Sequence, residues 1–546
     1  MKSGEKIVVE LEDGERRTFA LPSGTHSLAD VLAEQGLPLN TRCGQRGLCR
    51  GCEVTLYEGR LTMDGRSVSA PATIQACQAR PVGGATIHIP ARSRMEHKPQ
   101  VAETFEIAVA YAHQPLFAPV SGIRDMAFAV DVGTTTVVVL LVDLVTGEVL
   151  SRAGGFNEQI RFGDNVVTRI DHARSAEAIA SLQNAVVAET ITPLLLRACK
   201  RAGRPPDRIA GGAIVGNTTM LHLLAGEDPS SLGVAPFTPR FIEGRRFAAR
   251  QIALEIEGLR PETPVQLLPG IAAYIGADIT ADVYATGMIF EETPGLLADV
   301  GTNGEIVLQS GRRLMACATA AGPAFEGCGL SCGTRAKEGA VSDLRFTLDP
   351  FRLEADTVGG LPLARATGIC GSAYIDFLAQ ARRSGLLAET GRFEAMAWEK
   401  IPDGHRDVRG DERAVRLGDG GQAGQWRISE VDVALLLQAK AAIGAGIETL
   451  LLTAGVPAEN VGQVYLAGGF GMHLNVAHAI AIGLLPGFRE EQVRVVGNTA
   501  LAGALLALVD RNTLGEMEAL RAQVEVIELN LADGFEDRYI ENLMLP

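Results

Sequence analysis

The chain has 546 residues, of which 47% are hydrophobic and 21% charged, and this length exceeds what one hydrophobic core supports, so we expect several domains. Its 50 Lys and Arg against 65 Asp and Glu give a formal net charge of −15, and only 5% of residues are aromatic. A chain with no basic excess and few aromatic side chains is a poor candidate for binding nucleic acid.

Nothing in the sequence predicts secretion or membrane insertion. The first 17 residues contain no apolar h-region. The most apolar run, "TVVVLLVDLV", is shorter than a membrane span and contains Asp143. The nine cysteines are an odd number and four of them are bunched, which in a reducing compartment indicates metal binding rather than disulfides. We therefore expect a cytoplasmic protein with no membrane partner.

The first elements along the chain have the order of a β-grasp ferredoxin. Residues 5–20 alternate apolar and polar side chains around Asp13-Gly14, which predicts a β-hairpin. The segment "THSLADVLAEQGL" then predicts a short helix capped by Thr25 or Ser27. The predicted apolar face of this helix consists of Leu28, Val31 and Leu32.

A cysteine loop follows, with Cys43, Cys49, Cys52 and Cys77 in the spacing C-x5-C-x2-C-x24-C. This spacing is close to the plant-type pattern for a [2Fe–2S] cluster, although the first gap is five residues instead of four. Glycines within the loop let the backbone wrap closely around a cluster. A zinc site or free thiols are the alternatives, and we favour the four cysteines as ligands of a [2Fe–2S] cluster.

From residue 91 to residue 125 the periodicity fades and the chain becomes polar. This segment predicts a linker, and two forms of it stay open. A flexible tether would let the cluster move between an electron donor and an acceptor, whereas a packed connector would not.

The rest of the chain contains an internal repeat. "AFAVDVGTTTVVVLLVD" and "GLLADVGTNGEIVLQSG" share an apolar strand, Asp-Val-Gly-Thr and a second strand, with Asp131 and Asp299 in matching positions. Gly133 and Gly301 permit close backbone approach in such turns, and the following threonines offer groups that bind phosphate oxygens. The aspartates would face one gap and hold Mg²⁺ through water or position an attacking water. Two such motifs predict a duplicated fold with a nucleotide between its halves.

Two strand-to-helix turns add to this pattern. Gly468 and Gly469 follow a predicted strand, where bare backbone would accommodate the adenosine part of a nucleotide. Asn217 opens a second such turn in "GAIVGNTTMLHLLAG", and for this residue simple N-capping is the stronger interpretation.

These motifs, in this order, resemble the acetate and sugar kinase/Hsc70/actin (ASKHA) superfamily over residues 126–546. The segments "NEQIRFGDNVVTRI", "VGNTTMLHLLAG", "AAGPAFEG", "GICGSAYID" and "YLAGGFG" are more specific, and together with the cysteine loop they resemble the reductive activators of corrinoid proteins. That family joins a plant-type [2Fe–2S] domain to an ATPase domain.

The resemblance implies an architecture and a function. It implies a ferredoxin domain over 1–90, a linker over 91–125 and a two-lobed, RNase H-like ATPase over 126–546, with lobes at about 126–295 and 296–546. It implies ATP-dependent one-electron reduction of a Co(II) corrinoid protein to Co(I), with a low-potential electron donor as second partner and a possible homodimer.

The resemblance also implies roles for individual residues. It assigns catalytic roles to Asp131, Asp299, Glu305 and Glu326. For the two glutamates a purely structural interpretation is the alternative, with Glu305 as a solvated strand-end carboxylate and Glu326 as a loop carboxylate. It assigns the binding of ATP and its Mg²⁺ to Gly133, Thr134, Thr135, Gly301, Thr302, Asn303, Gly304, Gly468 and Gly469.

Several alternatives remain at this level. The chain could be a small-molecule kinase with a redox-sensing domain, an ATP-gated electron donor to another metalloenzyme, or a binding scaffold with an inert nucleotide pocket. Cys317, Cys328, Cys332 and Cys370 match no metal-binding spacing, so whether they bind anything stays open. Lys440 lies on a predicted apolar helix, and we expect its side chain to snorkel towards solvent rather than to bind a ligand.

Overall fold

The computed structural model describes residues 6–11, 15–21, 26–39, 41, 45, 47, 52–63, 65–90, 93–94, 105, 109, 111–301, 303–418, 425–469 and 474–546. Three predicted site residues, Cys43, Cys49 and Thr302, lie outside these residues. The chain divides into two compact units, one of Met1–His97 with Glu158–His172 and one of Lys98–Asn157 with Ala173–Pro546.

The N-terminal part has the β-grasp arrangement that the sequence predicts. Its sheet has the order β2-β1-β6-β3-β4, with β5 paired to β3. β1 pairs antiparallel with β2 and parallel with β6, so the predicted hairpin is confirmed. The elements are β1 (Lys6–Leu11), β2 (Arg16–Ala20), α1 (Leu28–Glu34), β3 (Glu53–Met63), β4 (Arg66–Ser69), β5 (Ala72–Gln75) and β6 (Ala79–Ile89).

Helix α1 begins with a capping box. Ser27 accepts a hydrogen bond from the Asp30 N–H, and the Asp30 carboxylate accepts one from the Ser27 N–H, which satisfies two N–H groups that the helix leaves unpaired. Leu28, Val31 and Leu32 are buried, as their spacing predicts. The Asp30 carboxylate also accepts a bond of 2.6 Å from Gln45 Nε2 and so connects the helix to the cysteine loop.

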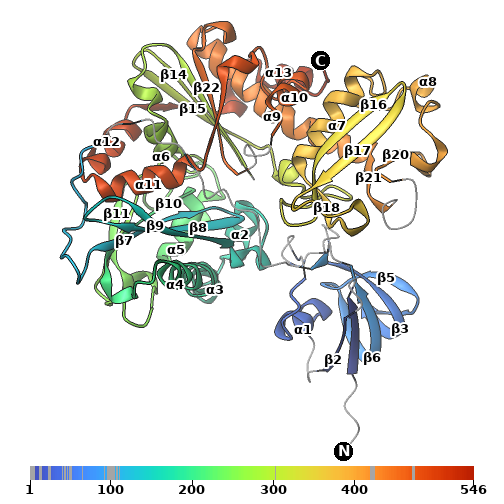
Figure 1. Cartoon of the computed structure of the whole chain (residues 1–546), viewed down its shortest axis with the longest axis horizontal. Coiled ribbons are helices and arrows are strands. Elements are labelled where there is room, and N and C mark those ends of the chain that lie inside the picture. Colours follow the sequence, from blue (N-terminus) through green and yellow to red (C-terminus); the bar gives the residue numbers. More distant parts are fainter. Residues whose placement is uncertain are drawn as a thin grey trace, which may run out of the picture. The chain divides into compact units, whose positions relative to one another are not determined.

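The ATPase region contains two sheets of matching topology. One has the order β11-β12-β10-β7-β8-β9 and the other β23-β22-β13-β14-β15-β24. In each, a first strand (β7 or β13) pairs antiparallel with the next strand along the chain and parallel with a later one. The repeat predicted from the sequence is therefore a repeat of structure (Figure 1), and the mixed α/β, two-lobed fold class is confirmed.

The strands of the first lobe are β7 (Met126–Val132), β8 (Thr136–Asp143), β9 (Val149–Phe156), β10 (Ile209–Gly216), β11 (Arg245–Ala248) and β12 (Pro264–Leu267). Those of the second lobe are β13 (Gly295–Val300), β14 (Gly304–Ser310), β15 (Arg313–Thr319), β22 (Gln463–Ala467), β23 (Val493–Gly497) and β24 (Val524–Val526). Two small sheets consist of β16 (Ala340–Leu348), β17 (Phe351–Thr357) and β18 (Gly368–Ile369), and of β19 (Arg406–Arg409), β20 (Glu412–Arg416) and β21 (Arg427–Ser429).

The helices after α1 are α2 (Val166–His172), α3 (Ala176–Val186), α4 (Thr192–Ala202), α5 (Thr218–Ala225), α6 (Ala277–Thr286), α7 (Gly371–Arg383), α8 (Ala395–Trp398), α9 (Glu430–Ala454), α10 (Val476–Ala481), α11 (Thr499–Val509), α12 (Asn512–Arg521) and α13 (Phe535–Asn542). Helix α11, although it follows the strands of the second lobe in the chain, packs against α6, β7 and β10 of the first (Figure 1).

The second half of the linker is packed. The N–H groups of Gln114 and Leu116 donate to the carbonyls of Val509 and Leu508 at the end of α11, both at 2.9 Å. The Ala112 N–H donates to the Asp510 carboxylate at 3.0 Å. The packed connector is therefore the correct interpretation for residues 112–116.

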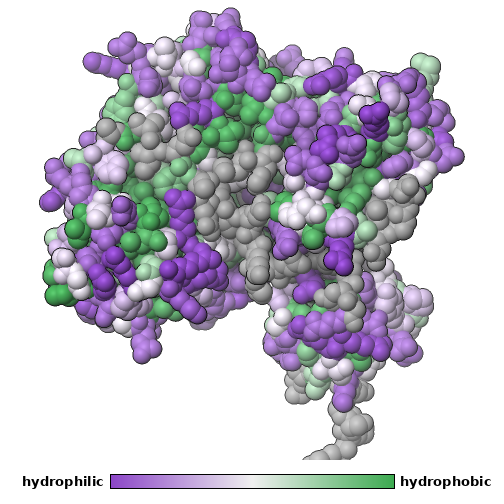
Figure 2. All heavy atoms as spheres, in the orientation of Figure 1, coloured by the Kyte–Doolittle hydropathy of each residue, from purple (hydrophilic) through white to green (hydrophobic). Residues whose placement is uncertain are grey.

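Two helical stretches of the described residues, Ala176–Ala202 and Glu430–Ala454, are long and apolar enough to cross a membrane by length and composition alone. The second is 78% buried inside the protein and the first packs on β8 and β9, which makes them weak evidence for a membrane span. The surface seen in Figure 2 is mostly hydrophilic, with smaller hydrophobic patches.

Lys440 does not snorkel, and that prediction is wrong. Its side chain is only 1% exposed within α9, and its ammonium donates a bond of 2.7 Å to the carbonyl of Met544 near the C-terminus. Burial lowers the pKa of Lys440 from 10.5 to about 8, because a low-dielectric environment disfavours the charged form.

This buried ammonium predicts a pH dependence of stability. Because the pKa is lower in the folded state, the unfolded chain binds more protons between about pH 8 and pH 10.5, so the unfolding free energy should rise across this interval by up to roughly 3 kcal/mol. Calorimetric melting of the full chain over this range should show the rise in the wild type and not in Lys440→Met. Lys400→Met, which replaces an exposed lysine, should keep the wild-type profile, and a Lys440→Met profile equal to the wild type would contradict the assignment.

Candidate functional site

Two hairpin turns bring the repeated aspartates to one place. Asp131 lies near the end of β7 and Asp299 near the end of β13. In the first turn the Gly133 N–H donates to the Thr136 carbonyl, and in the second the Gly301 N–H donates to the Asn303 carbonyl, both at 2.9 Å. The same local sequence thus builds a tight turn at the equivalent strand end of each lobe, although the closing hydrogen bond spans three residues in the first and two in the second.

Both turns line one cleft of the ATPase region. The cleft is polar and is formed by described residues of both lobes. They are Asp131, Gly133, Thr134, Thr135, Thr136, Asn217, Asp278, Asp282, Asp299, Gly301, Asn303, Glu305, Glu326, Gly468, Gly469, Asn498, Thr499 and Ala500. The structure therefore brings together all but two of the predicted catalytic and ATP-contacting residues, the exceptions being Gly304 and the undescribed Thr302.

The carboxylates of the cleft lie close to one another; Asp282 and Glu305 are buried, and the others are half-buried. Burial away from water raises the pKa of Asp131 to about 7 and that of Asp299 to about 6. It raises the pKa of Asp278 to about 8, with the negative charges of Asp299 and Asp131 adding to the effect. Desolvation likewise raises the pKa of Asp282 and Glu305 well above their ordinary values. Such a cleft attracts cations and protons.

The sequence analysis missed Asp278 and Asp282. They are four residues apart on α6, so they share one helix face, and this i, i+4 spacing in "GADITAD" was the available signal. Asp282 Oδ1 accepts a bond of 2.5 Å from the Thr499 hydroxyl. Its other oxygen, Oδ2, is buried and has no hydrogen-bond partner among the described residues.

Two asparagines, one from each lobe, support the first phosphate turn and the aspartate that precedes it. Asn217 caps α5, and its Nδ2 donates to the Thr134 hydroxyl at 3.0 Å. Asn498 caps α11, and its Nδ2 donates to the Asp131 carboxylate at 2.8 Å. Each amide thus uses its oxygen for the helix and its nitrogen for the phosphate turn. Capping is therefore correct for Asn217 but incomplete, and the repeat of "VGNT" at 215–218 and 496–499 was the signal for Asn498.

The predicted glycines differ in their roles. Gly468 has a φ of +90°, and a Cβ there would lie 2.3 Å from Asp299 Oδ1, so this position requires glycine beside the carboxylate. Gly304 is not among the residues that line the cleft. A Cβ on it would lie 2.6 Å from the Thr319 hydroxyl, which indicates packing, so its contact with ATP stays a prediction.

The two glutamates belong to the cleft. Glu305 is buried on β14, in register with Asp299 on β13. Glu326 is the last residue of the 3₁₀ helix Pro323–Glu326, and its carboxylate accepts a bond of 3.0 Å from the Thr135 hydroxyl. Glu326 therefore connects a loop of the second lobe to the first phosphate turn.

The donor set suits magnesium bound with a phosphate. Mg²⁺ in nucleotide sites takes one or two carboxylates together with waters and phosphate oxygens. Among the described residues no group of three or more His, Cys, Asp or Glu side chains is arranged to hold a metal ion by itself. The orphan Oδ2 of Asp282 and the buried aspartates fit an ion that arrives with a phosphate group.

Two of the four cluster cysteines are described, and both are buried. Cys52 precedes β3 directly and Cys77 follows β5 by two residues. The β3–β5 register pairs Glu53 with Gln75, and the Ala76 N–H donates to the Cys52 carbonyl at 3.1 Å. The fold thus brings two thiols from distant parts of the sequence to one end of a strand pair, as a [2Fe–2S] site requires.

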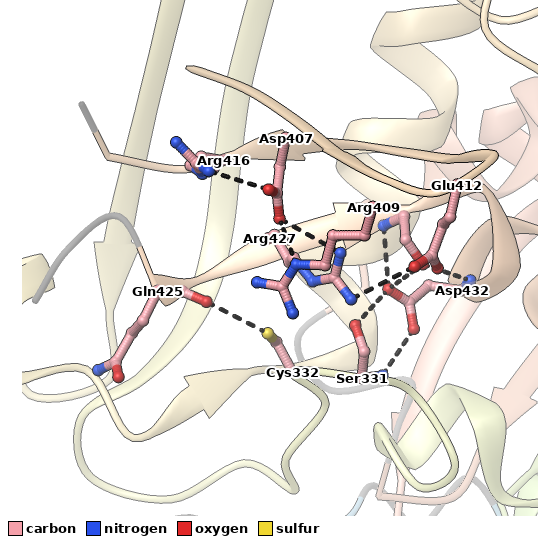
Figure 3. Close-up of polar contacts among 10 residues, drawn as sticks. Ser331, Cys332, Asp407, Arg409, Glu412, Arg416, Gln425, Arg427 and Asp432 are labelled. Atoms are coloured by element: carbon pink, nitrogen blue, oxygen red, sulfur yellow. Dashed lines mark hydrogen bonds and ion pairs between the residues drawn. The ribbon is translucent and has the colours of Figure 1, made fainter. Parts of the chain in front are cut away.

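The cysteines of the second lobe are all buried. Burial raises the pKa of Cys317, and that of Cys370 to about 12, so both are protonated and unreactive at neutral pH. Cys332 Sγ lies 3.7 Å from the Gln425 carbonyl, beside the contact between Ser331 and Asp432 (Figure 3). The structure gives no support for a second metal site among these residues.

Comparisons with known proteins agree with this geometry. Three family models match: a 2Fe-2S iron-sulfur cluster binding domain over residues 11–82, the RACo middle region over 126–291, and the C-terminal domain of RACo, the ASKHA domain, over 293–546. The chain belongs to the family of reductive activators of corrinoid proteins.

Relatives with similar chains include the corrinoid activation enzyme RamQ of Eubacterium limosum, which is 28% identical over 95% of this chain and 96% of that protein. A [Co(II) methylated amine-specific corrinoid protein] reductase of Methanosarcina barkeri is 27% identical over 74% of each. The solved structure of a reductive activator for corrinoid, iron-sulfur protein matches with a TM-score of 0.71 at 29% identity, covering 99% of this chain and 98% of that one.

Replacing Gly468 tests the cleft as a nucleotide site. We expect Gly468→Ala to raise the dissociation constant of Mg-ATP at least about tenfold, because the added Cβ displaces the Asp299 carboxylate. Gly311→Ala is the matched control, since Gly311 also has a positive φ, of +60°, but has open space around its Cβ position. Calorimetric titration of both variants measures the effect, and equal affinities for the two would contradict it.

Proposed function

We propose that this protein is an ATP-dependent reductase that returns an inactive Co(II) corrinoid protein of a methyltransferase system to Co(I). The observation that carries this proposal is the presence, in one chain, of a ferredoxin fold with a buried cysteine pair and an ATPase cleft with two phosphate turns. Two curated relatives bear names for this activity.

Energetics explain why the two modules occur together. A plant-type [2Fe–2S] cluster has a potential of about −400 mV, and the family resemblance implies that the corrinoid Co(II)/Co(I) couple lies lower. Each 100 mV of deficit costs about 2.3 kcal/mol per electron. A passive electron carrier would therefore leave the cobalt oxidised, and an ATPase domain provides the missing free energy.

The proposed roles of the residues follow from the two sites. The cysteines at 43, 49, 52 and 77 hold the cluster, which supplies one electron. In the cleft, Asp131 and Asp299 hold Mg²⁺ through water, and the turns at Gly133–Thr135 and Gly301–Asn303 bind phosphate oxygens through backbone N–H and hydroxyl groups. Gly468 and Gly469 leave room for the adenosine.

The domain boundaries that we propose are 1–90 for the ferredoxin domain, 91–125 for the linker and 126–546 for the ATPase. A reducing compartment suits a chain with bunched cysteines, and we place the enzyme in the cytoplasm. The second candidate, a small-molecule kinase, would need phosphoryl transfer to a substrate in the absence of any corrinoid protein.

The direct test is an anaerobic assay. The full chain, a low-potential reductant, Mg-ATP and the corrinoid protein encoded nearby are mixed, and the Co(I) absorbance is followed. We expect Co(I) to accumulate only with ATP. The proposal fails if ATP makes no difference with any candidate corrinoid protein.

Removing one cluster ligand should abolish the iron–sulfur site and leave the ATP site intact. We expect Cys52→Ala to lose the iron and the electron transfer, because the cluster needs four thiolates, but to bind Mg-ATP with wild-type affinity. Iron analysis, visible absorbance and calorimetric titration measure these properties. Cys199→Ala, which removes a buried cysteine on α4, should keep both the iron and the activity.

The converse change is Asp299→Asn. It keeps the size of the side chain and removes a carboxylate of the metal site, so we expect at least about a hundredfold loss of ATP hydrolysis with the iron content unchanged. Asp228→Asn, at a partly exposed aspartate paired with Arg240, should hydrolyse ATP normally. Loss of the cluster in Asp299→Asn would show that the substitution acts on folding and not on the site.

A further inference from the structure

Arg335 is a cation at the edge of the cleft that the sequence analysis did not single out. Its Nε lies 3.3 Å from Glu326 Oε2, and a terminal guanidinium nitrogen lies 3.3 Å from the Thr135 hydroxyl. The Thr135 hydroxyl itself donates to Glu326 at 3.0 Å. The three side chains form a closed triangle that joins the first phosphate turn to a loop of the second lobe.

The charge of the cleft makes this cation significant. Six of the described lining residues are carboxylic acids, and none is a lysine or an arginine. A nucleoside triphosphate brings about four negative charges, of which Mg²⁺ neutralises two. Arg335 contacts two lining residues, Thr135 and Glu326, and a positive group so placed would offset part of the remaining repulsion.

The main chain that carries Glu326 and Arg335 is tightly packed against itself. A Cβ on Gly327 would lie 2.4 Å from the Thr334 carbonyl oxygen, and one on Gly333 would lie 2.0 Å from the Gly327 carbonyl oxygen. The backbone after Glu326 therefore lies directly against the backbone before Arg335. The two side chains are thus fixed relative to each other by main-chain packing.

The same loop is anchored to α9. Asp432 accepts bonds from the Ser331 N–H at 2.6 Å and from the Ser331 hydroxyl at 2.7 Å (Figure 3). Asp432 also forms the capping box of α9 with Ser429. An arginine that served only as an exposed ion-pair partner would not need this anchorage, whereas one that must meet a phosphate at a fixed place does.

We propose that Arg335 is a catalytic arginine that binds the terminal phosphate of ATP, with Glu326 and Thr135 holding it at the cleft until the nucleotide arrives. This proposal rests on the proposed ATPase function and adds a residue to it. The terminal phosphate replaces Glu326 as the partner of Arg335, because a guanidinium binds phosphate through two parallel N–H donors. ADP has no terminal phosphate at this place, so Arg335 also distinguishes ATP from ADP.

The role of Arg335 in hydrolysis is electrostatic. The water oxygen forms a bond to the terminal phosphorus, the bond to the ADP oxygen breaks, and the proton of the water leaves with the products. Arg335 neither gives nor takes a proton and stabilises the charge on the transferred group. Because Arg335 and Thr135 come from different lobes, the phosphate that binds both would also hold the lobes together.

The test compares two nucleotides on the full chain with its cluster intact. In Arg335→Gln we expect the affinity for Mg-AMPPNP, a non-hydrolysable ATP analogue, to fall about 10- to 100-fold, and the affinity for Mg-ADP to change less than about threefold. ATP hydrolysis should fall by ~10³. Arg335→Lys should show an intermediate loss of preference for the triphosphate, since it keeps the charge and loses the bidentate geometry.

Arg345→Gln is the matched control. Arg345 also pairs with two carboxylates of the second lobe, Glu354 and Asp356, but these side chains are exposed on β16 and β17, and the loss of Arg345 should leave both affinities unchanged. Equal weakening of AMPPNP and ADP, or no weakening of either, in both Arg335 variants would overturn the proposal. A wild-type protein that binds neither nucleotide would instead overturn the ATP site itself.

Discussion

The constraint on which the ATPase region depends is the crowding of six carboxylic acids in one cleft, where Asp282 and Glu305 are buried and the others are half-buried. Three of them, Asp131, Asp278 and Asp282, come from the first lobe, and Asp299, Glu305 and Glu326 come from the second. Burying like charges together is costly, so such a cluster persists only where the surrounding fold determines it. The repeated sheets determine it here, because equivalent strands end at the cleft.

The polar groups around this cluster show how the fold stabilises it. Asn498 donates to Asp131, Thr499 donates to Asp282, and Asn217 holds the first phosphate turn through Thr134. These donors replace part of the water that the carboxylates lose. They come from the N-termini of α5 and α11, so the helices that close the cleft also supply its hydrogen bonds. A cation bound together with a phosphate would supply a partner for the carboxylate oxygens that no protein group satisfies, such as Asp282 Oδ2.

The ferredoxin domain obeys a different constraint. Its cysteines must converge on one cluster, and the register of β3 and β5 accomplishes this for Cys52 and Cys77. An electron carrier alone would need nothing more. In the proposed function the attached ATPase drives the electron from the cluster to an acceptor of lower potential.

The sequence by itself determined whatever depends on neighbouring residues. The Asp13-Gly14 hairpin, the Ser27 cap, the cysteine spacing and the duplicated Asp-Val-Gly-Thr turns are local patterns with local physical causes. Only the tertiary structure decided which distant residues share the cleft, as for Asp278, Asp282, Asn498 and Arg335, and which side of a helix faces the interior, as for Lys440. The reason is that burial and charge proximity arise from packing between elements far apart in the chain, which local periodicity does not encode.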